Sequence, residues 1–117
     1  MVRAFLVLIL LAAVSLARAG EARVVSVVPV KTGATWRFDV TVRHADAGWD
    51  HYADAFVVST PDGEELGRRV LHHPHVDEQP FTRSLGGVAL PEGVRTVTVH
   101  AVDSVHGPGP AVSVPLP

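Results

Sequence analysis

The sequence predicts an all-β protein in which seven strands form a two-layered sandwich. Beyond residue 20, short runs rich in valine, threonine and aromatic residues alternate with glycine and proline, and no segment sustains the 3.6-residue period of an amphipathic helix. Apolar and polar residues alternate strictly over 35–43, which is typical of a strand with one face in a core and the other in water.

Each expected strand is a β-rich run bounded by turn residues, and in chain order the runs are 23–30, 35–43, 52–60, 65–71, 81–85, 94–102 and 111–116. The second and sixth alternate most clearly. Their predicted core residues are Trp36, Phe38, Val40, Val42, Val97, Val99 and Ala101.

The connections between these strands are of two kinds. Three are compact turns that contain glycine or proline, at 31–33, 61–63 and 91–93. The other three are long, at 45–51, 72–80 and 103–110. Because successive connections of such a sandwich alternate between its two ends, we expect the long loops to share one pole.

Residues 1–19 have the pattern of a secretory signal peptide. Arg3 is followed by an apolar run over 4–17, and Ala17 and Ala19 are the small residues that a signal peptidase requires. Cleavage after Ala19 would leave residues 20–117 as a single domain in the periplasm or outside the cell. An uncleaved anchor is the alternative, but the run is shorter than the ~20 apolar residues that cross a bilayer.

The net charge and the lack of cysteine limit the macromolecules and metals that the protein is expected to bind. Removal of residues 1–19 leaves 8 basic and 12 acidic residues, a formal charge of −4, which does not favour nucleic acid or an anionic membrane surface. A protein partner in the periplasm remains open. The chain has no cysteine, and Met1 would leave with the signal, so a metal would need nitrogen and oxygen ligands. That requirement disfavours Cu(I) and leaves Zn(II), Cu(II) or Ni(II) as candidates.

Histidines are concentrated in the long loops. His73 and His75 form an H-x-H pair whose side chains would point the same way on extended backbone, with Glu78 or Asp77 as a further ligand. From the other loops, His51 and His106 are the expected additional ligands. The alternative is that polar loops simply collect polar residues.

Aromatic and acidic residues accompany these histidines. Trp49, Tyr52 and Phe81 could form an interaction surface, or could cap the open end of the core. The carboxylates of Asp50, Asp54 and Asp103 could orient imidazoles by accepting their second N–H, or could bond to their own loops.

Parts of the sequence resemble three groups of known proteins. The segments 90–93, 97–103 and 107–110 resemble the E–F turn, F strand and F–G loop of fibronectin type III modules, with Arg95 where that family has tyrosine, and imply an Ig-like sandwich. The segments 48–52 and 73–81 resemble a group of small exported bacterial proteins of unassigned function. The spacing of Gly67, His73, His75, Glu78 and Gly86 is similar to the first metal motif of cupins, so a small cupin-like barrel is the alternative fold; the early glutamate and Thr96 depart from that pattern.

The sequence thus predicts an exported β-sandwich that binds Zn(II) or Cu(II) through His73, His75, His51, His106 and Glu78, for metal carriage or a metal-dependent interaction. A metal-free module that docks through the loop from Trp49 to Tyr52 is the second hypothesis, and a small metal-dependent enzyme is the third. Recognisable nucleophile or phosphate-binding motifs are lacking.

Overall fold

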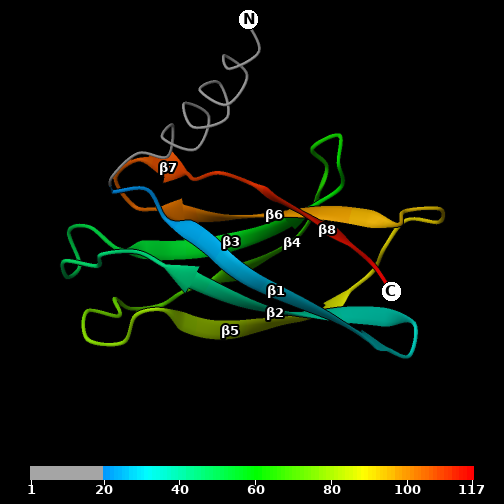
Figure 1. The fold of residues 1–117 in the computed structure, drawn as a ribbon, viewed down its shortest axis with the longest axis horizontal. Helices are drawn as coiled ribbons and strands as arrows, with labels where there is room; N and C mark the ends of the chain where they lie inside the picture. Colours follow the sequence, from blue (N-terminus) through cyan, green and yellow to red (C-terminus); the bar gives the residue numbers. More distant parts are fainter. Residues whose placement is uncertain (1–19) are drawn as a thin grey trace, which may run out of the picture.

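The computed structural model describes residues 20–117, and the predicted signal peptide lies outside the described residues. Two antiparallel sheets pack as a sandwich, which confirms the predicted fold class (Figure 1). One sheet has the order β1 (Arg23–Thr32), β2 (Thr35–Arg43) and β5 (Phe81–Val88). Within the described residues, no helix is long and apolar enough to cross a membrane.

The second sheet is built around β6 (Thr96–Asp103). On one side of β6 lie β3 (Ala53–Ser59) and then β4 (Glu65–Val70). On the other side β6 pairs with the short β7 (Gly107–Pro108) and with β8 (Val112–Pro115). All seven expected strands are therefore present, and β7 is an additional short strand.

The core lies between the inward faces of β2, β3 and β6. Alternate residues of β2 and β6 are buried, as their alternation predicted, and Phe56 and Val58 of β3 complete the contact. Phe81, expected as an interaction residue, is only 2% exposed and belongs to this core, because it is the first inward residue of β5. Its ring is therefore not available to a partner.

The connections divide between the two ends of the molecule as predicted. In Figure 1 the turns that follow β1, β3 and β5 lie at the right, and the loops that follow β2, β4 and β6 lie at the left. We call the left end, formed by 44–52, 71–80 and 104–106, the histidine pole. Two of its loops cross from one sheet to the other and so cover the end of the core.

Truncation of Trp36 to alanine tests the core assignment. Trp36 is 9% exposed and stacks on Phe38 with 6.5 Å between ring centroids. We expect Trp36→Ala to lower the free energy of unfolding by ~3–5 kcal/mol, as large core truncations do. Urea denaturation in the presence of a chelator measures the change. Val28→Ala, at a side chain that is 51% exposed, is the control and should change it by less than ~0.5 kcal/mol. A loss below ~1 kcal/mol for Trp36→Ala would contradict the assignment.

Candidate metal centre

The candidate site lies where the inward faces of β2 and β6 reach the histidine pole. Along β2 the alternation of buried residues continues past the end of the strand to His44 and Asp46, and along β6 it ends at Asp103. The side chains of these three residues have no solvent exposure. Charged groups so far from water require partners, and each of the three has them.

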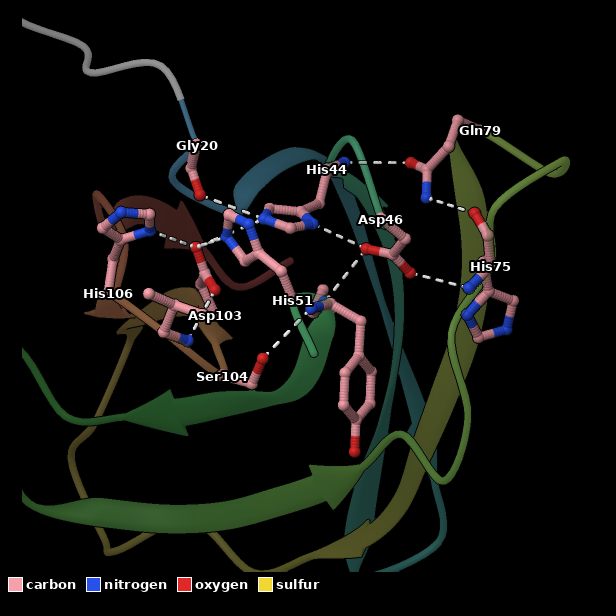
Figure 2. Close-up of polar contacts among 12 residues, drawn as sticks. Gly20, His44, Asp46, His51, His75, Gln79, Asp103, Ser104 and His106 are labelled. Atoms are coloured by element: carbon pink, nitrogen blue, oxygen red, sulfur yellow. Dashed lines mark hydrogen bonds and ion pairs between the residues drawn. The ribbon is translucent and has the colours of Figure 1, made fainter. Parts of the chain in front are cut away.

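His44 donates hydrogen bonds from both of its ring nitrogens. Nδ1 lies 2.6 Å from Asp46 Oδ1, and Nε2 lies 3.0 Å from the Gly20 carbonyl oxygen and 3.2 Å from Asp103 Oδ2 (Figure 2). A carbonyl and an ionised carboxylate have no hydrogen to donate, so each ring nitrogen must carry one. In the metal-free protein His44 is therefore an imidazolium between two carboxylates.

Asp103 accepts hydrogen bonds at both carboxylate oxygens. Besides His44, its Oδ2 faces His51 Nε2 at 2.8 Å and His106 Nδ1 at 2.7 Å, and Oδ1 accepts from the Val105 N–H at 2.8 Å. Burial by itself raises the pKa of Asp103. The donors of Val105, His106 and His51, together with the charge of His44, outweigh burial and hold this pKa well below its ordinary value. Asp103 therefore stays ionised.

Asp46 connects the two loops that cross between the sheets. Its Oδ1 accepts from the backbone N–H of Ala53 at 3.0 Å, and its Oδ2 accepts from the backbone N–H of His75 at 2.7 Å. Gln79 makes a parallel link, because its side chain accepts from the His44 backbone N–H and donates to the His75 carbonyl, both at 2.9 Å. The loops 44–52 and 71–80 are thus fastened to each other around His44.

Strand pairing positions His51 beside Asp103. Ala53 and Asp103 are partners in the β3–β6 ladder. Tyr52 and Ser104 extend it, since the Ser104 N–H donates to the Tyr52 carbonyl at 2.9 Å and the Ser104 hydroxyl accepts from the Tyr52 N–H at 3.0 Å. The side chains of His51 and His106 are 28% and 44% exposed, so the cluster opens to solvent on their side.

Three of these side chains could hold a metal ion. His44, His51 and Asp103 each offer one ligand atom, and the three atoms lie within 4.8 Å of one another. Tetrahedral donors at zinc are about 3.3 Å apart, given bonds of about 2.0 Å. The Nε2 atoms of His44 and His51 lie 3.2 and 2.8 Å from Asp103 Oδ2, close to that spacing, whereas separations within the group reach up to 4.8 Å. The two imidazoles would therefore move toward each other around an ion. Asp46, which accepts the other N–H of His44, is the kind of partner that orients a metal-binding imidazole.

The expected ligands are divided between two places. His51 and His106 lie in the cluster around Asp103. His73 and His75 are neighbours, with ring centroids 4.8 Å apart, but they do not belong to the converging set of metal-binding side chains among residues 20–117. The physical reason is Arg83, whose Nη2 lies 3.0 Å from His75 Nε2 and 3.3 Å from Glu78 Oε1, so that a guanidinium already holds the position of the cation.

His75 is held as a neutral ring. Its Nε2 must accept from Arg83, so Nδ1 carries the hydrogen, and this buried N–H has no partner among the described residues. The ring lies flat on Phe81, with centroids 4.0 Å apart and an interplanar angle of 10°. Burial, and next the charge of Arg83, lower the pKa of His75. The backbone of His75 contributes to the site, whereas its imidazole does not.

The aromatic residues of the first loop are at the surface. Trp49 is 67% exposed and packs edge to face on Tyr52, with ring centroids 5.7 Å apart. Unlike Phe81, Trp49 is therefore available for contact with another molecule.

Two residues of the site, His44 and Asp46, were not among the expected ligands, and Asp103 was expected only as an orienting partner. A signal for them exists in the sequence. The spacing of two that places Trp36, Phe38, Val40 and Val42 inward places His44 and Asp46 inward as well, and the stripe that includes Val97, Val99 and Ala101 ends at Asp103. Histidine or aspartate at a position that continues the two-residue spacing of buried core residues is therefore the signal for this site.

Comparison with known proteins gives one informative match. No protein-family model matches the chain, and neither does any solved structure. A "Putative lipoprotein" of Halomicrobium mukohataei is 44% identical to the chain over 90 residues. That alignment covers 76% of this chain and 44% of the relative, so the chain spans less than half the length of the relative that it matches.

The lowered pKa of His75 predicts a loss of stability in mild acid. Below the ordinary histidine pKa of ~6.5 the unfolded chain binds a proton that the folded ring resists, so the free energy of unfolding should fall as pH decreases through that value. His75→Phe keeps the flat ring and the backbone N–H but cannot be protonated. We expect this variant to lose less stability than the wild type between pH 7.5 and 5.5, as measured by urea denaturation with a chelator present.

The matched control for this test is His73→Phe, which replaces the neighbouring exposed ring. It removes the third cause of the lowered pKa of His75 but leaves burial and Arg83, the two larger causes, so it should keep most of the pH dependence of the wild type. If His75→Phe also keeps it, the buried neutral state of His75 is refuted.

Proposed function

We propose that this protein is an exported β-sandwich that binds one Zn(II) or Cu(II) through His44, His51 and Asp103, and that it serves in metal carriage or in a metal-dependent interaction. One observation carries the proposal: three imidazole nitrogens surround a single buried carboxylate oxygen, and the innermost imidazole is oriented by a second buried carboxylate. Imidazole and carboxylate are ligands that both metals accept.

The charges of the site favour a cation. Without metal, the carboxylates of Asp46 and Asp103 and the imidazolium of His44 have a formal sum of −1. A divalent ion that displaces the proton from His44 Nε2 brings this sum to zero, which removes the electrostatic penalty of a charged cluster in a poorly solvated place. His106 would keep its hydrogen bond to Asp103 and so hold the carboxylate in position.

Export is supported by two independent features. Residues 1–19 have the composition of a secretory signal, and the relative from Halomicrobium mukohataei is named as a lipoprotein, a name that suggests an exported or membrane-anchored protein. A protein that folds outside the cytoplasm meets the metals of that compartment, which suits a carrier. The periplasm or the cell exterior is therefore the location that we propose.

A second candidate function is docking on a protein partner through the histidine pole. The observation in its favour is that each of the three loops there exposes a large apolar side chain: Trp49 is 67%, Val76 is 55% and Val105 is 58% exposed. Large apolar side chains exposed at one end of a molecule are a feature of interaction surfaces when they form one patch. This function would not need a metal.

Titration calorimetry on residues 20–117 tests the metal site. We expect one Zn(II) or Cu(II) per chain, and we expect Asp103→Asn and the double variant His51→Ala/His106→Ala each to weaken binding by about 100-fold or more, because each removes a ligand or the group that orients one. The double variant changes only partly exposed side chains, so it should still fold.

The matched control is His73→Ala/His75→Ala, which removes two histidines of the same pole outside the proposed ligand set. It should bind the metal with the affinity of the wild type. Loss of binding in this control, with binding retained in His51→Ala/His106→Ala, would transfer the site to the H-x-H pair. Absence of binding in the wild type would refute the metal function.

Photocrosslinking separates the docking function from the metal function. A photoreactive residue in place of Trp49 should give a crosslinked species of defined mass in the native compartment, and the same residue in place of Lys31, near the opposite pole, should not. The species should persist with chelator if docking is independent of metal. Equal crosslinking from both positions would refute a docking surface at Trp49.

A further inference from the structure

Gly20 lies at the candidate metal centre. The carbonyl oxygen of Gly20 accepts the Nε2 hydrogen of His44 at 3.0 Å, and Figure 2 shows this residue between the rings of His44 and His106. A Cβ on Gly20 would lie 3.1 Å from His106 Cε1, so glycine allows the backbone to approach closely. Both rings also contact Asp103 Oδ2. Gly20 is therefore a neighbour of the proposed ligands.

The position of Gly20 is fixed by the residues that follow it. Ala22 is fully buried, and its carbonyl is packed so closely against Gly109 that a Cβ there would lie 2.0 Å from the carbonyl oxygen. One residue later, Arg23 pairs with Arg43 at the start of the β1–β2 ladder. The backbone is thus held in position from Ala22 onward, and only one residue, Glu21, separates Ala22 from Gly20.

We infer that the α-amino group of Gly20, once released by processing, is a further ligand of the metal held by His44, His51 and Asp103. This inference rests on the proposed function. Hydrolysis of the Ala19–Gly20 amide adds one water, leaving a carboxylate on Ala19 and an amine on Gly20. Before hydrolysis this nitrogen is an amide whose lone pair is delocalised into the carbonyl, so it is a poor donor. Processing would therefore complete the site.

The covalent geometry of one residue brings this amine within reach. The nitrogen and the carbonyl oxygen of a residue are separated by no more than about 3.6 Å, so the Gly20 amine lies close to the oxygen that already contacts His44. The two atoms can also bind one ion together as a five-membered chelate ring. Two imidazoles, an amine and a carboxylate make a nitrogen-rich set, which suits Cu(II) or Zn(II) and not Mg(II) or Ca(II).

The experiment compares two forms of one chain, residues 20–117 with a free amine and the same residues with the amine acetylated. Acetylation keeps the Gly20 carbonyl for His44, and it removes the donor lone pair together with the positive charge of the terminus. Melting temperatures of the metal-free forms therefore serve as the control for any change in stability. We expect acetylation to weaken Cu(II) and Zn(II) binding about tenfold or more in calorimetry, as the loss of one supporting group does. The Cu(II) absorption band should also move to longer wavelength, because a nitrogen donor is lost.

Chains that begin at Ala19 provide a second comparison, since their free amine lies one residue away from the site. They should bind as the acetylated form does. Equal affinity and equal Cu(II) spectra for the free and acetylated forms would overturn the inference and leave the proposed metal site intact. No binding by either form would instead refute the proposed function.

Discussion

A buried cation between two buried carboxylates organises the histidine pole. His44 extends from β2 in one sheet and Asp103 ends β6 in the other, so their contact joins the two layers. Asp46, the second partner of His44, also holds the loops that cross between the layers. Removal of one member of such a group leaves an unpaired charge away from water and typically costs about 3–5 kcal/mol. The loops therefore depend on this charge arrangement for their conformation.

Stability alone does not account for charged residues at these positions. Replacement of a whole buried ion group by well-packed apolar residues is often neutral or stabilising, so three such residues at inward positions are weak evidence for a stabilising role. Most other buried side chains are valine, alanine, leucine or aromatic, and the further buried polar residues among 20–117 are Ser59, Thr60 and His75. The proposed cation-binding role would explain charged residues at these positions, because polar groups that contradict the local pattern are expected at functional sites.

Most of the fold could be predicted, and the site only partly. Period-two alternation set the inward residues of β2 and β6, and glycine and proline marked the turns, so the layers and the division of loops between the poles followed. His51 and His106 were expected because their loops meet at one pole. The expectation that His73 and His75 bind a metal did not take Arg83 into account. This arginine follows Glu78 by five residues, and from β5 its guanidinium contacts both His75 and Glu78. A histidine spacing describes geometry, whereas the occupant of the space depends on tertiary contacts.

His44 and Asp46 were missed for a different reason. Polar residues after a strand are ordinarily assigned to a loop. Only the fold shows that the alternation of buried and exposed side chains continues for two more buried positions past the end of β2. Asp103 is the last residue of β6, one position past the end of the strand expected from the sequence. The available clue to these residues was the two-residue spacing of inward side chains, continued past the expected ends of the two strands.

The ligands of the candidate site come from distant parts of the sequence, 44, 51 and 103, and they meet only after the two sheets have docked. A chain that is still unfolded, as during passage through a translocation channel, has no preassembled site to capture an ion. Contacts of such long sequence separation form late, since loop closure must precede them. The identity of the bound ion would then be decided by the metal supply where folding finishes, and not by the supply where the chain is synthesised.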